Sequence, residues 1–162
     1  MSDAGAGGMF MRRRNGARPA MGRKELGMLI REFTADDFAA ATALWERCGL
    51  HPSASDTPAG LAEVARYNPG LFLLAFDGER LVGTVLGSWD GRRGWINRLA
   101  VDAVRRGAGL GRRLIALAEQ RLRERGCVKV NLLIEADNAA AADYYATLGY
   151  SRDPLIFMEK WL

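Results

Sequence analysis

A glycine-rich run, RLAVDAVRRGAGLG over residues 98–111, combines residue types that could bind an anion. Its glycines at 107, 109 and 111 allow tight turns and let backbone N–H groups approach a ligand without a Cβ in the way. A helix expected to begin there adds unpaired N–H donors and a partial positive charge. Further positive charge comes from Arg105, Arg106, Arg112 and Arg113. The run therefore predicts an anion site suited to a pyrophosphate.

The glycine spacing differs from two common phosphate motifs. No Gly-Lys-Ser/Thr follows, which excludes a P-loop. The spacing Gly107-x-Gly109-x-Gly111 also departs from the dinucleotide-binding pattern GxGxxG, and the chain lacks a repeating βαβ pattern. On spacing alone, a glycine-rich turn from strand to helix in an unrelated fold stays open as an alternative.

Regular patterns on both sides would position this run. Residues 93–101 are expected to be the last strand of an antiparallel meander, after strands at 71–76 and 80–89 with Asp-Gly turns between them. After the run, apolar residues follow helical spacing at Leu110, Leu114, Leu117, Ala118 and Leu122. A strand thus leads into the glycine-rich loop, and an amphipathic helix leads out of it.

The N-terminal part of the domain is expected to contain one strand and two helices. Residues 28–34 alternate apolar and polar and indicate a strand. Thr34 would cap a helix running to about Cys48. A shorter helix is expected at about 57–66, after a polar loop.

The C-terminal part is expected to return to the sheet. The apolar stretch 128–134 predicts a short strand that is central and buried. Asn138 would cap a helix over 139–148, and 150–162 would supply one or two terminal strands. The order β-α-α-β-β-β-α-β-α-β defines an α+β domain with a mixed, mostly antiparallel central sheet flanked by helices.

The glycine-rich run is one of two motifs that occur in order. Arg106–Gly111 matches the signature R/Q-x-x-G-x-G/A, and Leu99-Ala100-Val101 matches the strand before it. Asn138–Tyr145, followed by Leu148-Gly149-Tyr150, matches an N-x-x-A-x-x-x-Y…G-F/Y run. In these motifs the sequence resembles the GNAT superfamily of acyl-CoA-dependent N-acyltransferases, and the resemblance covers residues 28–162. It is closest to small single-domain bacterial members, and it implies a GNAT-like fold.

The resemblance implies a role for each matched position. Leu99, Ala100 and Val101 would bind the pantetheine arm of coenzyme A, offering backbone groups as an added strand would. Asn138 would contact the same cofactor arm, and Tyr145 would protonate the departing thiolate. The family's pyrophosphate-binding main chain falls on Arg106, Gly107, Ala108, Gly109, Leu110, Gly111 and Arg112.

The implied reaction moves an acetyl group from acetyl-CoA to a primary amine of a small molecule, peptide or protein. Acyl transfer needs a neutral amine, a polarised thioester carbonyl and a stabilised thiolate. The implied route is direct attack in a ternary complex without a covalent enzyme intermediate.

The general base is the weakest part of the match. Many relatives carry a glutamate near Asn97, and asparagine cannot accept a proton in its place. A water chain, or an amine that is already partly neutral, remains open. Candidate bases elsewhere are His51, Glu79, Asp90, Glu135 and Asp137.

Composition limits the domain count and the partners. The 162 residues have room for one domain. The net charge of +4 lies within residues 1–28, whereas 29–162 sum to zero. Residues 1–27 are therefore expected to be a disordered basic extension before a domain over 28–162. A nucleic-acid partner would have to use this extension. No apolar stretch approaches the roughly 18 residues of a membrane helix, so no membrane partner is expected.

Few residues could bind a metal or form a disulfide. Cys48, Cys127 and the single histidine have no metal-ligand spacing, so no metal is expected. Sparse cysteine is typical of a reducing compartment and predicts a cytoplasmic protein. The resemblance also allows a homodimer through the C-terminal strands, which carry Ile156, Phe157 and Trp161.

Three alternative functions remain at this stage. The first is a regulatory module that binds coenzyme A without turnover, which the asparagine at 97 leaves open. The second is a nucleic-acid-associated protein that acts through the basic N-terminal extension. The third is another acyl-CoA chemistry, such as O-acyl transfer.

Overall fold

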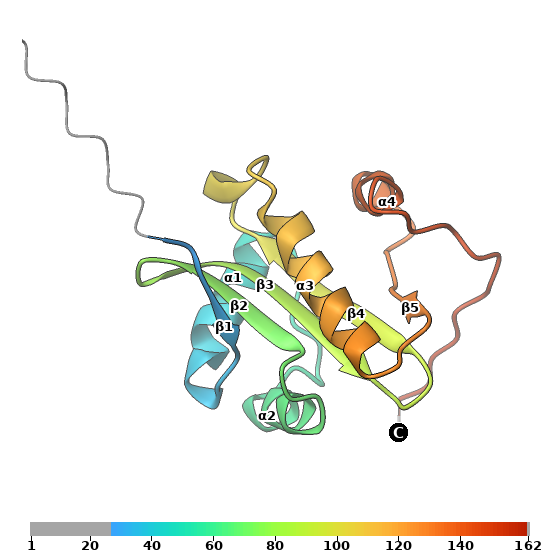
Figure 1. Cartoon of the computed structure of the whole chain (residues 1–162), viewed down its shortest axis with the longest axis horizontal. Helices are drawn as coiled ribbons and strands as arrows, with labels where there is room; N and C mark the ends of the chain where they lie inside the picture. The colour runs from blue at the N-terminus through green and yellow to red at the C-terminus, as the bar shows by residue number, and fades with distance from the viewer. Residues whose placement is uncertain (1–26, 162) are drawn as a thin grey trace, which may run out of the picture.

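Five strands form one sheet in the order β1-β2-β3-β4-β5 (Figure 1). The computed structural model describes residues 27–161. Strands β1 to β4 pair antiparallel with their sequence neighbours, and β5 runs parallel to β4. The strands are β1 (Leu29–Glu32), β2 (Phe72–Asp77), β3 (Arg80–Trp89), β4 (Gly94–Val101) and β5 (Val130–Asn131). The expected α+β fold with a mixed, mostly antiparallel sheet is confirmed.

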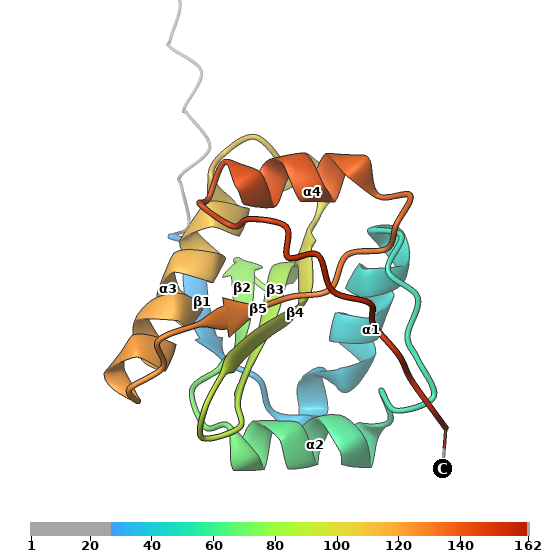
Figure 2. The same cartoon turned by 90° about the vertical axis from the view of Figure 1, so that its right-hand side faces the viewer.

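Helices cover both faces of this sheet, as Figure 2 shows. Helices α1 and α2 contribute Trp45 and Leu61 to the buried cluster on one face, whereas α3 contributes Leu114 and Ile115 to the cluster on the other. Helix α4 lies across one end of the sheet. The helices are α1 (Phe38–Arg47), α2 (Pro58–Tyr67), α3 (Leu110–Glu124) and α4 (Ala139–Ala146). Short 3-10 turns precede α1 (Ala35–Asp37) and α3 (Ala103–Arg105).

Polar side chains fix the starts of the first two helices. The Asp37 carboxylate accepts hydrogen bonds from the backbone N–H and hydroxyl of Thr34, at 2.8 and 2.9 Å. Two Arg31 nitrogens of β1 donate to the same carboxylate, each at 2.7 Å. Thr57 caps α2 by accepting the N–H of Gly60 at 3.0 Å. The Arg31 contacts tie the start of α1 to β1, and the Thr57 cap stabilises the first turn of α2.

Helix α3 approaches the sheet closely at two glycines. A Cβ on Gly83 of β3 would lie 3.0 Å from a Leu114 methyl, and one on Gly94 of β4 would lie 2.9 Å from a Leu122 methyl. A larger residue at either position would have to displace a leucine side chain of α3. The helix is therefore seated on the sheet along most of its length.

The stretch expected as a central, buried strand is instead a short edge strand. Only Val130 and Asn131 pair with β4, and both are half-buried. Val128 and Leu133 are exposed, to 93% and 55%. The expectation of a central position was wrong because no described strand pairs with the outer edge of β5.

The terminal strands expected over 150–162 are not found among the described residues. No strand is assigned after α4, and residues 151–161 are all exposed. A strand forms only where its backbone pairs with a neighbour, and the two residues of β5 offer almost nothing for it to pair with. Ile156, Phe157 and Trp161 are exposed, so the homodimer remains a prediction.

The N-terminal extension is mostly outside the structural description. Residues 1–26 of the expected 1–27 extension lie outside the described residues. Its disorder and its use as a nucleic-acid-binding arm therefore remain predictions.

Candidate active site

The glycine-rich loop presents a row of backbone donors. Gly107 and Gly109 adopt left-handed φ values of 76° and 79°, which glycine takes without strain. The N–H groups of residues 107–109 have no hydrogen-bond partner in the described part of the chain, and those of 110–112 open α3, where helices leave N–H groups unpaired. The first bond of the helix runs from Arg113 N to Gly109 O, at 3.0 Å. Six consecutive donors thus stand where the sequence predicts an anion site.

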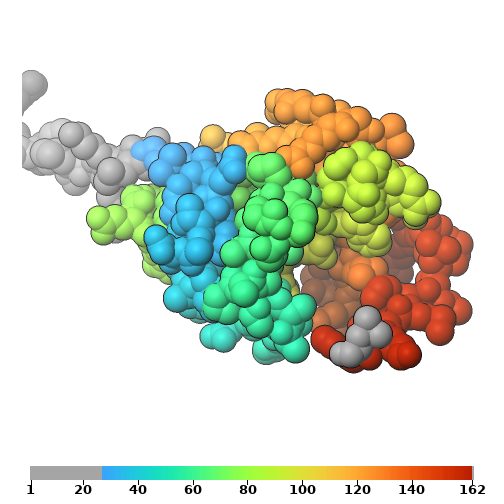
Figure 3. Space-filling model, turned by 90° about the horizontal axis from the view of Figure 1, so that it is seen from below, coloured from blue at the N-terminus to red at the C-terminus, as the bar shows by residue number. Residues whose placement is uncertain are grey.

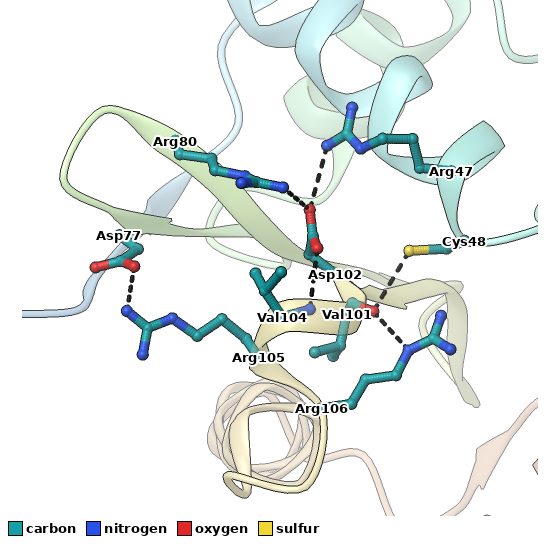
Figure 4. A network of polar contacts seen from close by, with 9 residues as sticks. All are labelled: Arg47, Cys48, Asp77, Arg80, Val101, Asp102, Val104, Arg105 and Arg106. Carbon is teal, nitrogen blue, oxygen red and sulfur yellow. Dashed lines mark hydrogen bonds and ion pairs between the residues drawn. The ribbon is translucent and has the colours of Figure 1, made fainter.

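Asp102, which is buried, anchors the start of this loop (Figure 4). Its carboxylate accepts the N–H of Val104 at 3.2 Å and a hydrogen bond from Arg80 at 2.8 Å. Arg47 of α1 lies 3.6 Å from the same carboxylate. The Val104 N–H and then the Arg80 guanidinium lower the pKa of Asp102. The carboxylate stays ionised at neutral pH and ties the loop to β3 and α1.

The end of β4 lies beside this network (Figure 4). The Val101 carbonyl accepts hydrogen bonds from Arg106 Nε at 3.0 Å and from Cys48 Sγ at 3.4 Å. Beyond Gly94 and Trp95, no described strand pairs with the outer edge of β4. The backbone edge at 97–101 is therefore open to an added strand, except at the Val101 carbonyl, which side chains already use.

Strand β4 carries a bulge that the sequence analysis missed. The register with β3 shifts between Thr84 and Leu86, and Arg98 takes a φ of +51°. The Thr84 hydroxyl donates to the Arg98 carbonyl at 2.8 Å and accepts from Trp45 Nε1 at 2.9 Å. No glycine marks this position, so no sequence signal identified it.

Tyr145 lies between two other tyrosine rings. Its ring packs edge-on against Tyr144 and Tyr150, with centroids 5.6 and 5.4 Å away. Burial, and then the neighbouring Tyr144, raise the pKa of Tyr145 to about 12. The hydroxyl therefore stays protonated at neutral pH and can act as a hydrogen-bond or proton donor.

Tyr144 extends from α4 to the first turn of α3. A Cβ on Gly111 would lie 2.7 Å from the Tyr144 hydroxyl. The glycine at 111 thus leaves space for this contact. The sequence analysis had no signal for it, because the two helices are far apart in the chain.

Asn138 caps α4. Its side-chain oxygen accepts the N–H of Ala141 at 3.0 Å. The expected cap is confirmed, and the cofactor contact that the resemblance implies remains a prediction.

The candidate bases lie on separate segments. Asp90 accepts the N–H groups of Arg93 and Arg92, both at 2.7 Å, and these bonds lower its pKa. Asp90 is thus occupied in the β3–β4 turn. His51 is exposed in the α1–α2 loop, and Glu135 and Asp137 are exposed between β5 and α4. Glu79 is exposed in the β2–β3 turn, so none of the five has the surroundings of a buried base.

Within 27–161, no group of three or more His, Cys, Asp or Glu side chains could hold a metal ion. No helix in the same range is long and apolar enough to cross a membrane.

Comparisons with known proteins identify the family of this chain. A model of the acetyltransferase (GNAT) family matches residues 28–150. The chain belongs to this family. Acetyltransferase SG1711 of Sodalis glossinidius is 37% identical over 136 residues, which cover 83% of this chain and 96% of the relative. Acetyltransferase ECA0875 of Pectobacterium atrosepticum is 38% identical over 135 residues, with the same coverage.

Solved structures share the fold. Ard1 from Thermoplasma volcanium superposes with a TM-score of 0.67 at 26% identity, covering 76% of this chain and 82% of that protein. The PaiA N-acetyltransferase from Thermoplasma acidophilum, solved in complex with coenzyme A, reaches a TM-score of 0.70 at 16% identity. That superposition covers 81% of this chain and 94% of PaiA. These findings support an acyltransferase built on the GNAT fold.

Proposed function

We propose that this protein is an N-acetyltransferase that moves the acetyl group of acetyl-CoA to a primary amine. The six consecutive backbone donors at residues 107–112 carry the proposal. Such donors at a helix N-terminus suit the pyrophosphate of coenzyme A, because the helix dipole adds positive potential there. PaiA, which shares the fold, was solved in complex with coenzyme A, and this supports coenzyme A as a ligand of the fold.

The open edge of β4 suits the pantetheine arm. Leu99 and Ala100 lie on the part of β4 beyond its pairing with β5. Amide groups of pantetheine can pair there as an added strand does. This places the thioester near the Arg98 bulge, where backbone N–H groups can polarise its carbonyl.

The chain's own groups would handle the protons of the reaction. The amine nitrogen forms a bond to the acetyl carbon, and the carbon–sulfur bond breaks. Tyr145 donates a hydrogen bond or proton to the leaving sulfur, for which its protonated hydroxyl is suited. The proton lost by the amine passes to water, because Asn97 lacks a basic group. We place the reaction in the cytoplasm, since Cys48 and Cys127 are both free.

Thermal unfolding with acetyl-CoA, beside NADH and ATP, tests the donor. Ligand at 100 times its Kd stabilises by about 2.7 kcal/mol, which is several degrees for a domain of this size. A shift with acetyl-CoA alone is expected. Primary amines are then screened by release of free thiol from acetyl-CoA. No shift with acetyl-CoA would contradict the proposal.

A second candidate is a coenzyme A-binding module without turnover. Asn97, exposed on β4 near the proposed thioester site, favours it, because many family members carry a glutamate near this position. Binding of coenzyme A without thiol release for any amine would identify this module.

A further inference from the structure

Arg98 is held in a backbone conformation that costs free energy. Of the residues that the structure describes, it is the one non-glycine residue with a positive φ, at +51°. Side chains other than those of asparagine and aspartate rarely adopt this region. Strain of this kind persists where surrounding contacts hold it, and it clusters at functional sites.

The Arg98 side chain makes contacts that fix it in place. Its guanidinium pairs with the Asp56 carboxylate, donates to the His51 carbonyl at 3.2 Å, and lies over the Trp45 ring at 5.1 Å. The side chains of Arg98 and Asp56 are only 19% and 10% exposed. The attraction between two charges this sheltered from water is screened less than it would be on the open surface.

Asp56 also organises the loop between α1 and α2. Its carboxylate accepts the backbone N–H of Ser53 at 2.6 Å and the Ser53 hydroxyl at 2.8 Å. The loop from His51 to Asp56 is therefore tied to the β4 bulge through one guanidinium. We call Arg98 and its contacts with Asp56 and His51 the loop clamp.

The clamped loop borders an open part of the sheet face opposite α3. Arg98 contacts α1 through Trp45, whereas its neighbours Ile96 and Leu99 pack in the cluster with α3. Seen from below (Figure 3), the surface is hollowed between the green and teal atoms of α2 and the loop before it and the red atoms of the C-terminal segment. The Arg98 guanidinium and the clamped loop lie on the α1 side of the sheet, and the hollow lies beside that loop.

We propose that Arg98 is a positioning residue for the acceptor: the loop clamp holds residues 51–56 against the β4 bulge, so that this loop forms one wall of the amine-binding site. The inference rests on the proposed function. It assigns Arg98 to the amine side of the reaction, because its contacts reach the α1–α2 loop and none reaches the glycine-rich loop.

Three variants separate the clamp from the bulge. Arg98→Gly keeps the bulge, because glycine adopts a φ of +51° without strain, and removes the clamp. Asp56→Asn removes the charge at the other end. Arg98→Lys keeps a charge but loses the planar fork that reaches two partners.

The kinetic test uses acetyl-CoA with the best acceptor among a lysine peptide, an N-terminal α-amine peptide and a polyamine. Arg98→Gly and Asp56→Asn are expected to raise the amine KM about tenfold, with kcat changed less than about threefold and the Kd of coenzyme A within about twofold. The amine KM of Arg98→Lys is expected to lie between the value of these two variants and that of the wild type. Unchanged amine KM in Arg98→Gly overturns the proposal, as does an equal loss of coenzyme A affinity.

The matched control is Asp37→Asn. It makes the same carboxylate-to-amide change in an ion pair that joins β1 to the start of α1, away from both loops. It is expected to lower thermal stability and leave the amine KM unchanged. A rise in KM here as large as in Asp56→Asn would show a general loss of structure and overturn the positioning role.

Hydrogen exchange gives a reading that needs no acceptor. The amides of Ser53 and Asp56, which are hydrogen-bonded at 2.6 and 3.0 Å, are expected to exchange at least about tenfold faster in Arg98→Gly than in the wild type. Unchanged exchange would show that Arg98 does not hold the loop, and it would overturn the proposal even if the wild type acetylates amines. Faster exchange in Arg98→Gly, together with a wild type that transfers acetyl to no amine, would confirm the clamp and reject the proposed function instead.

Discussion

Two loops meet near the same strand, and each is held by a carboxylate paired with arginine. The glycine-rich loop is anchored by Asp102, which Arg80 and Arg47 approach from β3 and α1. The α1–α2 loop is anchored by Asp56, which Arg98 approaches from β4. The first loop presents backbone N–H groups beyond its anchor, whereas the second presents side chains.

In the proposed reaction, this difference would separate the two substrates. A loop that binds through backbone donors can recognise a pyrophosphate in any member of a family, because the donors do not depend on side-chain identity. A loop that presents side chains can differ between relatives and select different acceptors. The donor would thus be common to the family, and the acceptor particular to this chain.

The largest expected effect lies outside both loops, at Tyr145 on α4. Tyr145→Phe keeps the ring packing against Tyr144 and Tyr150 and removes only the hydroxyl. We expect kcat to fall about 100-fold, as is typical for loss of a proton donor. The Kd of coenzyme A, measured by calorimetry, should stay within about twofold. A loss of coenzyme A affinity with unchanged kcat would show that Tyr145 binds the cofactor and does not donate the proton.

The next effect concerns the backbone donors. Gly109→Val forces a branched side chain into a φ of +79° and places it beside the donors. We expect coenzyme A to bind about 30-fold more weakly, or about 2 kcal/mol. Gly91→Val is the matched control, because Gly91 has a φ of +90° in the β3–β4 turn. Calorimetry should show normal affinity there, and equal losses in both variants would refute a local effect.

The third prediction concerns the Arg31–Asp37 ion pair, which is expected to affect stability and not substrate binding. The Arg31 hydrogen bonds lower the pKa of Asp37 to about 2. The unfolded state therefore binds this proton more tightly, and the pair stabilises the fold above the unfolded pKa of about 4. Asp37→Asn should cost about 2 kcal/mol at pH 7. The difference should shrink as the pH falls from about 4 to 2, and urea unfolding across this range would show it. A constant difference down to pH 2 would exclude the ionised carboxylate as its source.

The smallest expected effect is at Asn131 on β5. Its side-chain nitrogen is buried and has no hydrogen-bond partner among the described residues. Asn131 pairs with Trp95, one residue beyond the Gly94–Val130 pair that faces α3, so it points to the opposite face. Asn131→Leu should lower the free energy of unfolding by less than about 0.5 kcal/mol, and it can also raise it, because the unpaired amide is removed. Destabilisation by more than about 1 kcal/mol in urea unfolding would indicate a protein partner for this amide.

The sequence predicted those features that depend on local rules. β3 begins and ends where the Asp-Gly turns placed it, over Arg80–Trp89. The glycine-rich loop and α3 follow from the spacing of glycines and leucines. Each depends on backbone freedom or on a periodic apolar face within about 20 residues, which a sequence displays directly.

The features that were missed depend on contacts between distant segments. The Arg98 bulge is held by Asp56 and Thr84, and Tyr144 reaches Gly111 from another helix. An arginine in a strand looks like any exposed charge until its partner is known. The prediction of terminal strands was wrong for a related reason: a strand needs a neighbouring edge to pair with, and β5 is only two residues long.

The close seating of α3 on Gly83 and Gly94 has a consequence for binding. A helix fixed on the sheet in this way cannot slide without a clash at a glycine or a void beside it. We therefore expect the donors at its first turn to keep nearly the same positions when a ligand binds. In the proposed function, little conformational entropy would then be lost on binding the pyrophosphate, and more of the interaction free energy would remain as affinity.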